Sequence, residues 1–201
     1  MRATAVREDI KYLILDAADR LLARYGYKKM TVDDLANEVG IGKGTVYLHF
    51  SSKEEVVLSH VDRIVSRLLE RLEEIAASDS SPSEKIKEML FARVVMRFDS
   101  VQHYTESLAD VLRSLRSPLL KRREKHFESE AAVFTRVLRE GERTKRFRPQ
   151  ADVRETVYAL LSATNSLLPF SLSAQELGER IEVEKRVNKI ADLLLEGLQT
   201  N

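Results

Sequence analysis

The stretch from Thr31 to Phe50, TVDDLANEVGIGKGTVYLHF, constrains the fold more than any other part of the chain. Its first half predicts a short helix with one apolar stripe, formed by Val32, Leu35, Ala36 and Val39. Thr31 is suited to cap that helix, with Asp34 as the acidic partner three residues later. Gly40 supplies the left-handed backbone that ends a helix. The second helix, from Lys43 to Phe50, is too short to be stable alone and requires packing partners.

Two short helices around a glycine turn form the pattern of a helix-turn-helix, whose second helix enters the major groove of DNA. The simpler alternative is an ordinary corner between two helices of a helical protein. The run of Tyr47, His49 and Phe50, followed by Lys53, favours the helix-turn-helix.

The glycines of this turn also invite comparison with a phosphate-binding loop, because GIGKGT runs from Gly40 to Thr45. Such a loop needs lysine followed directly by serine or threonine, and it must follow a strand. Here Gly44 separates Lys43 from Thr45, and the segment before the turn has helical periodicity. Both observations argue against nucleotide binding at this turn.

Three segments together resemble the DNA-binding region of the TetR/AcrR family of bacterial regulators. They are TVDDLA from Thr31, VGIGKGTVYLHF from Val39 and SKEE from Ser52. The apolar, glycine, aromatic and lysine positions match in order over about twenty residues. One departure is Gly42, which stands where the family more often has serine. It removes a side-chain cap from the second helix and leaves only backbone donors there.

The resemblance and the helix geometry together assign roles to the DNA-binding residues. Gly44 and Thr45 lie at the end of the second helix that enters the groove. Tyr47 and His49 resemble the family's phosphate and sugar contacts, and Tyr47 alternatively reaches a thymine methyl group. Leu48 either faces DNA or turns back to the protein, and the sequence leaves this open. The predicted DNA-binding residues are Thr31, Lys43, Gly44, Thr45, Tyr47, His49 and Lys53, with Thr31 and Lys53 as phosphate clamps.

Net charge neither supports nor opposes DNA binding. The formal charge of the 201 residues is +1, and residues 1–61 hold nine Lys or Arg against nine Asp or Glu. Between Val39 and Lys53, however, there are two lysines and no acidic residue. The proposed contact surface is therefore locally positive, which is what phosphate affinity requires.

The rest of the chain predicts further helices and no strand, so the expected fold is all-α. Residues 1–52 should form a three-helix head and residues 53–201 a helical body for effector binding and dimerisation. Helix 53–77 should link the two. The SDSSPS run from Ser78 is the clearest break between helices. The expected helices are 7–25, 53–77, 83–99, 104–115, 118–141, 152–168 and 183–198, besides the two short ones.

The resemblance implies a transcriptional repressor that binds a palindromic operator as a homodimer through its last two helices. A small-molecule effector bound in the body would release it, with helix 53–77 transmitting the change. Two rival functions stay open. One is a helical interaction module without a DNA role, and the other is a nucleotide-binding or enzymatic protein that uses the glycine turn.

The expected effector is largely hydrophobic, because the predicted pocket lining is mainly apolar. The lining residues are Phe91, Arg93, Val95, Arg97, Phe98, Leu108, Phe127, Phe134, Leu161 and Asn165. Arg93 and Arg97 lie one turn apart and would give the effector an anionic end if they contact it. The favoured alternative is that both reach solvent or pair with acids such as Glu88 or Asp110. Residues 113–148 form a basic stretch, which is likewise either a solvated helix face or a surface that attracts an acidic ligand.

Several classes of protein are excluded or disfavoured by what the sequence lacks. Without cysteine there is no disulfide framework and no thiolate metal site. The four histidines show no metal-ligand spacing, and no carboxylate pair suggests catalysis. We therefore expect that the protein is not an enzyme and that it binds no metal and no cofactor. No apolar run approaches the roughly 20 residues that span a bilayer, and no signal peptide is visible. These features indicate a cytoplasmic protein without membrane association.

Overall fold

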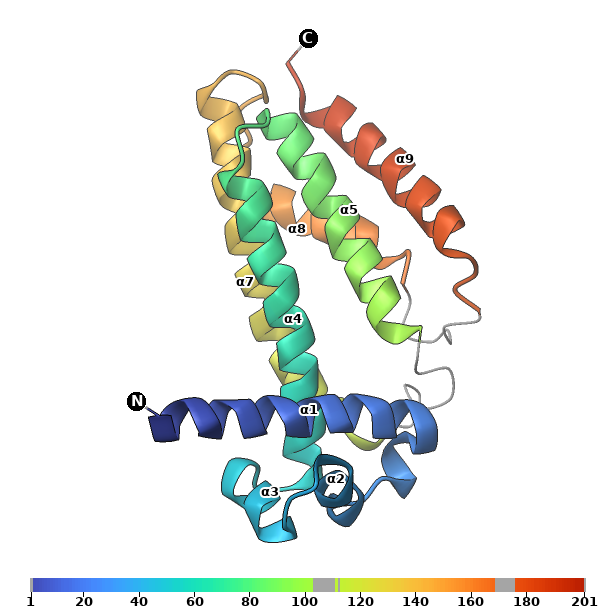
Figure 1. Ribbon diagram of the computed structural model, residues 1–201. Helices are drawn as coiled ribbons and strands as arrows, with labels where there is room; N and C mark the ends of the chain where they lie inside the picture. The colour runs from blue at the N-terminus through green and yellow to red at the C-terminus, as the bar shows by residue number, and fades with distance from the viewer. Residues whose placement is uncertain (1, 103–110, 112, 169–175, 201) are drawn as a thin grey trace. The chain divides into compact units, whose positions relative to one another are not determined.

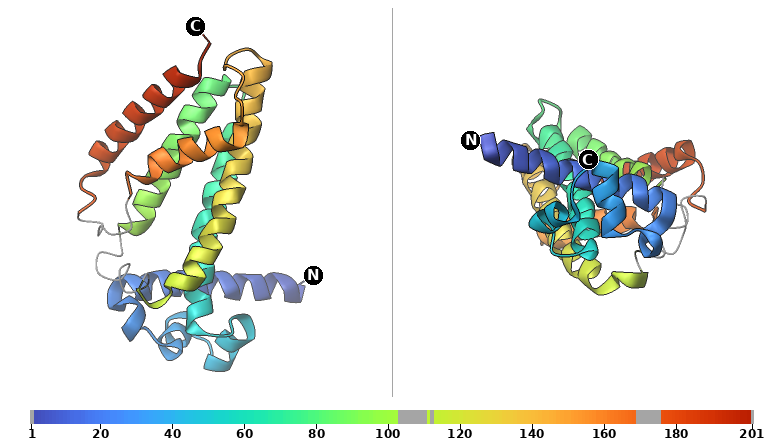
Figure 2. Two further views of the ribbon diagram at one scale, coloured as in Figure 1. Left: turned by 180° about the vertical axis from the view of Figure 1, so that it is seen from behind. Right: turned by 60° about the horizontal axis from the view of Figure 1, so that its bottom comes forward.

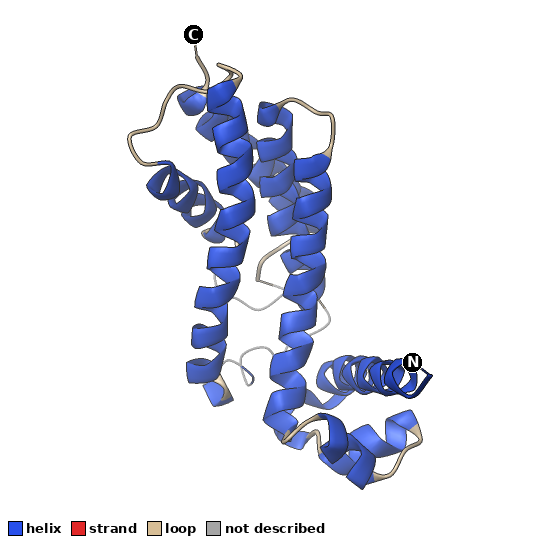
Figure 3. Cartoon of the chain, turned by 90° about the vertical axis from the view of Figure 1, so that its left-hand side faces the viewer, coloured by secondary structure: helices blue, strands red, loops and turns tan. Residues whose placement is uncertain are grey.

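The computed structural model describes residues 2–102, 111, 113–168 and 176–200. This described part contains eight helices and no strand (Figures 1 and 3). The helices are α1 (Arg2–Lys29), α2 (Val32–Val39), α3 (Lys43–His49), α4 (Lys53–Ala77), α5 (Pro82–Val101), α7 (Arg116–Arg143), α8 (Val153–Asn165) and α9 (Arg180–Leu198). The predicted all-α class is confirmed. The helix expected over 104–115 lies mostly outside the described residues.

The helix boundaries follow local capping chemistry. At the start of α5, the Ser81 side chain accepts a hydrogen bond from the Glu84 backbone, and the Glu84 side chain accepts one from the Ser81 backbone. Asp152 caps α8 by accepting from two backbone N–H groups, those of Arg154 and Glu155. Within α1, Gly26 has φ 71° and ψ 168°, so the helix breaks where the sequence predicted, and a further turn continues to Lys29.

The chain forms two compact units. The first comprises Met1–Ile64 and His103–Arg122, and the second comprises Val65–Gln102 and Arg123–Asn201. α4 and α7 each contribute residues to both. The domain boundary predicted at residue 52 is not tested by this division into compact units, so it stays a prediction.

One hydrophobic core holds the first unit together. α1 contributes Ile14, Ala18, Leu21 and Leu22, and α2, α3 and α4 add the buried residues of their apolar faces. Val111 and Leu115 also belong to this core, although they lie far along the chain from the helix-turn-helix. Arg122, near the start of α7, bonds Glu55 of α4 at 2.8 Å and also bonds Asp62. The core of the first unit therefore includes a segment that the sequence assigned to the body.

The second unit has a larger core, to which five helices contribute. Leu72 of α4, Leu90 of α5, Phe134 of α7, Leu161 of α8 and Ala191 of α9 are all buried in it. α5 and α9 lie side by side and run in opposite directions, and α8 crosses them obliquely (Figures 1 and 2). A smaller cluster joins Val94 and Phe98 of α5 to Val183 and Val187 of α9 and to Leu177. Among the described helices, none combines the length and apolar character needed to cross a membrane.

Gly141 provides a stability test, because the ring of Phe147 lies where its side chain would be. A Cβ built on Gly141 would lie 2.0 Å from Phe147 Cδ2, and the Phe147 side chain is fully buried. We expect Gly141→Ala to lower the free energy of unfolding by about 1–3 kcal/mol, as overpacking does. Chemical denaturation of both proteins measures the difference.

Gly197 is the matched control, since a Cβ there meets no atom within 4 Å. Gly197→Ala should leave stability unchanged or raise it by up to about 1 kcal/mol, because alanine favours the helix. Equal effects of the two substitutions would contradict this account of the Phe147 contact.

Candidate nucleic-acid interface and effector region

α2 is held at both ends by the residues that the sequence singled out. Thr31 Oγ1 accepts from the Asp34 backbone N–H at 3.1 Å, and Asp34 Oδ2 accepts from the Thr31 backbone N–H at 2.8 Å. The predicted capping box is thus confirmed. These hydrogen bonds, first from the Thr31 hydroxyl and then from its backbone, lower the pKa of the Asp34 carboxyl.

The turn between α2 and α3 is a Schellman motif. Gly40 has φ 76° and ψ 33°, as predicted for a left-handed cap. The Ile41 N–H donates to Ala36 O at 2.9 Å and the Gly40 N–H to Asn37 O at 3.2 Å, which is the hydrogen-bond pair of that motif. Because a helix precedes these glycines, the structural setting of a phosphate-binding loop is absent from this turn.

α3 separates a buried face from an exposed one. Val46 and Phe50 are buried in the core of the first unit, whereas Tyr47 is 50% and Leu48 69% exposed. Gly42 begins α3 without a side-chain cap, as the sequence predicted. Leu48, which the sequence left open, therefore points to solvent. α3 therefore presents two large side chains, those of Tyr47 and Leu48, to solvent, as a recognition helix would have to.

The two lysines near α3 are used differently. Lys43 Nζ lies 2.7 Å from Asp33 Oδ2, both side chains are well exposed, and the hydrogen bond to Asp33 raises the Lys43 pKa. Lys53 Nζ instead donates to Tyr27 O and Met30 O, each at 3.0 Å, and lies 4.4 Å from the centre of the Tyr27 ring. Two of the three ammonium donors of Lys53 thus satisfy carbonyls at the end of α1.

Of the remaining predicted DNA-binding residues, Gly44, Thr45 and His49 belong to α3, and Thr31 precedes α2. Thr31 and Gly44 are exposed, and Thr45 and His49 are partly buried. The first unit therefore carries all seven of these residues, namely Thr31, Lys43, Gly44, Thr45, Tyr47, His49 and Lys53.

In the second unit, the predicted effector residues divide between two apolar clusters and one polar network. Phe127, Phe134 and Leu161 belong to the large core. Phe91 and Phe98 belong to the smaller cluster, and Val95 is buried. Leu108 lies outside the described residues.

Arg93, Arg97 and Asn165 form the polar network, together with Glu130. The side chain of Arg93 is 1% exposed and that of Glu130 0% exposed, and Arg93 Nε donates to Glu130 Oε2 at 2.5 Å. Arg97, 32% exposed, donates to the other Glu130 oxygen. Burial, and then the charge of Arg97, lowers the pKa of Arg93 to about 10, which still leaves it charged near neutral pH.

The favoured interpretation, that these arginines reach solvent or pair with acids, agrees with their pairing with Glu130, but Glu88 is not the partner. Arg93 does not reach solvent, and Glu88 instead bonds Arg71 at 2.6 Å. Glu88 lies five residues before Arg93, about 140° further round the helix, so it faces away. Asp110 lies outside the described residues.

Sequence reasoning missed Glu130, although a signal for it exists. Glu130 stands three residues after Phe127 and four before Phe134, so it occupies the apolar stripe of α7. An acidic residue in such a stripe indicates a buried partner of opposite charge.

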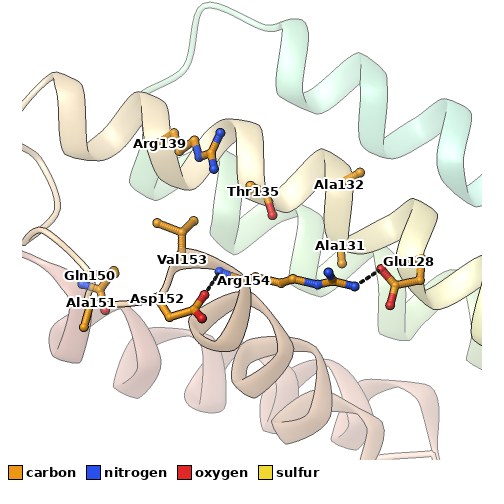
Figure 4. A pocket seen from close by; sticks show the side chains of 10 residues that line it. All are labelled: Glu128, Ala131, Ala132, Thr135, Arg139, Gln150, Ala151, Asp152, Val153 and Arg154. Atoms are coloured by element: carbon orange, nitrogen blue, oxygen red, sulfur yellow. Dashed lines mark hydrogen bonds and ion pairs between the residues drawn. The ribbon is translucent and has the colours of Figure 1, made fainter.

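A groove of about 560 Å³ lies elsewhere, between α7 and the start of α8 (Figure 4). Its floor includes Ala131, Ala132 and Thr135, and Arg154 crosses it to bond Glu128 at 2.8 Å. None of the predicted effector residues lines this groove.

Comparison with known proteins agrees with this geometry. Residues 14–59 match the family model of bacterial regulatory proteins, tetR family. The chain is 30% identical, over 149 residues, to the fatty acid metabolism regulator protein of Bacillus subtilis, covering 72% of this chain and 74% of that one. The chain belongs to the tetR family of bacterial regulatory proteins. It is also 27% identical, over 155 residues and 75% of each chain, to the HTH-type transcriptional repressor KstR2 of Mycobacterium tuberculosis.

A solved structure of a transcriptional regulator has a similar fold. The transcriptional regulator FadR from Bacillus subtilis, determined in complex with stearoyl-CoA, superposes with a TM-score of 0.71 at 20% identity. The match covers 92% of this chain and 98% of that one. As a member of the tetR family of bacterial regulatory proteins, the chain is a transcriptional regulator and not an enzyme, as the sequence predicted.

The two lysines of the first unit test the division between structural and exposed cations. Lys53→Ala should lower the free energy of unfolding by about 1–3 kcal/mol, because it leaves two carbonyls without their charged donor. Lys43→Ala should leave it unchanged within error, since exposed ion pairs contribute little. Urea denaturation of both variants measures this, and a larger loss for Lys43→Ala would contradict the assignment.

Proposed function

We propose that this regulator binds palindromic operator DNA as a homodimer and leaves it when a small-molecule effector binds. The observation that carries the DNA part is the two-faced α3, which buries Val46 and Phe50 and exposes Tyr47 and Leu48. Burial fixes the orientation of the helix, so the same side chains always face outward. Such a protein acts where the DNA is, in the cytoplasm.

Each residue around α3 has a proposed contact. Gly44 and Thr45 approach base edges, while Tyr47, His49 and Thr31 contact phosphate or sugar. Lys43 exchanges Asp33 for a DNA phosphate, and the release of counterions from the DNA favours this exchange. Lys53 has one ammonium donor left for a phosphate and otherwise holds the end of α1 beside α4.

Dimerisation through α8 and α9 is supported by the residues these helices leave exposed. The outward face of α8 carries the small residues Ala159, Ser162 and Ser166, which permit close helix approach. On α9, the large apolar side chains of Ile181 and Leu193 are 56% and 54% exposed, so both are available to a partner helix. Two-fold symmetry would set the recognition helices about 34–36 Å apart, one DNA turn.

The effector is proposed to be a largely hydrophobic molecule bound in the second unit. The aromatic residues Phe91, Phe98 and Phe127 supply apolar surface there. The names of the relatives support the ligand class, since one is a fatty acid metabolism regulator and another was solved with stearoyl-CoA. An effector that binds one conformation better than the other would shift the population away from the DNA-bound form.

Selection of bound duplexes from random DNA tests the operator proposal. The wild-type protein should select an inverted repeat, and Tyr47→Ala should bind the selected duplex roughly 30-fold more weakly, at about 1 kcal/mol per half-site. Sedimentation should show the same dimer for both proteins. Tyr12→Ala on α1 is the control, because Tyr12 is also exposed. Unchanged affinity of Tyr47→Ala would contradict the placement of the recognition helix.

Leu48 provides a separate test of base contact. An exposed leucine on a recognition helix is suited to the methyl group of thymine. Replacing the contacted thymine by deoxyuridine removes only that methyl group and should weaken wild-type binding about fourfold per half-site, near 0.8 kcal/mol. Leu48→Ala should bind the two duplexes equally. If Leu48→Ala loses affinity on replacement at the same thymines as the wild type, and by the same factor, Leu48 does not contact the methyl group.

A further inference from the structure

The polar network of the second unit carries more positive than negative charge. Both oxygens of the buried Glu130 are engaged, one by Arg93 and one by Arg97, so these three groups sum to +1. The pKa of Arg123 of α7 is lowered, first by burial and then by the charge of the nearby Arg97. The carbonyl end of α8 offsets part of the excess, because Arg93 Nη1 donates to Leu161 O at 3.1 Å. A helix end supplies only about half a charge, so positive charge remains.

The two arginines of α5 differ in how fully their donors are used. Arg93 is buried and directs four hydrogen bonds to Glu130, Leu161 O, Thr164 Oγ1 and Asn165 Oδ1. Arg97 directs only two, to Glu130 and Asn165 Oδ1, and its side chain is 32% exposed. Of the five N–H groups of a guanidinium, three on Arg97 thus have no acceptor within the part of the chain that the structure describes.

Asn165 extends this donor surface. Its Oδ1 accepts from Arg93 at 3.0 Å and from Arg97 at 3.3 Å, which fixes the amide orientation. The Nδ2 group must then point away from both guanidinium groups, and no described residue accepts from it. The acceptors of the network are therefore turned inward, and its open side presents only N–H donors and positive charge.

We propose that Arg97 and the side-chain amide of Asn165 form a subsite for the anionic group of the effector, a carboxylate or a phosphate. Arg93 and Glu130 are its buried scaffold, which holds α5, α7 and α8 together without contacting the ligand. The apolar part of the same molecule lies against Phe127, a partly buried aromatic residue one turn before Glu130 on α7. The inference rests on the proposed function in taking the second unit as the effector-binding part.

Asn165→Asp is the decisive variant. The new carboxylate still accepts from Arg93 and Arg97, so the scaffold keeps its hydrogen bonds, but the two Nδ2 donors are replaced by a negative charge. Arg97→Gln removes the positive charge from the other side of the subsite. Arg154→Gln is the matched control, because Arg154 is an exposed arginine of the same unit that bonds Glu128 instead.

Calorimetric titration of the full-length protein with dodecanoate, dodecanoyl-CoA and the neutral dodecanol tests the ligand class. Wild type and Arg154→Gln should bind at least one anionic ligand at least tenfold more tightly than dodecanol. Asn165→Asp and Arg97→Gln should lose that preference. Tight binding of dodecanoate indicates that a carboxylate occupies the subsite, and tight binding of the CoA ester alone indicates a phosphate. Equal affinity for dodecanol and both anions, or no binding of any of them, would overturn the proposal.

Thermal unfolding in phosphate and in chloride at equal ionic strength gives a second readout. An anion that binds only the folded protein raises the midpoint, and the increment grows with the logarithm of one plus the ratio of the anion concentration to Kd. The phosphate increment should be smaller in Asn165→Asp than in wild type, whereas equal increments would count against the subsite. Operator binding by the same wild-type preparation separates the two proposals. If DNA is bound and no anion is, the subsite is wrong while the operator function stands.

Discussion

The structure of the first unit depends on the burial of one face of α3, a helix that is not stable in isolation. α3 has seven residues, far fewer than an isolated helix needs in water, and it begins without a side-chain cap. Its stability comes from Val46 and Phe50, which enter a core built by α1, α2, α4 and the residues Val111 and Leu115. The exposed residues Tyr47 and Leu48 are oriented only because these two are buried. The shape of the exposed face of α3 is thus a consequence of the packing beneath it.

In both units, some cationic side chains stabilise the fold through internal hydrogen bonds, while others lie at the surface. Lys53 satisfies carbonyls at the end of α1, and Arg122 bonds Glu55 and Asp62 of α4. In each case a long side chain joins segments that are distant in the sequence. This use of charge explains why the first 61 residues, which hold equal numbers of basic and acidic residues, still suit a DNA-binding protein. Among these residues, Lys53 bonds backbone carbonyls and Arg20 pairs with Glu38, so a count of charges does not describe the charge available at the surface.

Burial of the charged network of the second unit costs desolvation free energy, but the network produces a specific arrangement of positive charge. Transfer of Arg93 and Glu130 out of water is offset only because nearly every donor and acceptor of the pair is hydrogen-bonded. Apolar residues of the same volume could fill this space at similar stability, but they would not present a positive surface beside aromatic side chains. The partly exposed Arg97 distinguishes the network from a purely structural ion pair.

The sequence by itself determined the helix-turn-helix, its capping box, the left-handed Gly40 and the all-α class. These features depend on periodicity and on contacts between residues three to five apart, which the local sequence contains. It also identified Arg93 and Arg97 as a pair and Asn165 as a lining residue, but not their partner, because Glu130 lies 37 residues from Arg93. Only the tertiary structure decided that Lys53 turns inward, that Leu48 turns outward and that Val111 and Leu115 join the first core. Each of these outcomes depends on which distant segments pack together, and local periodicity holds no information about that.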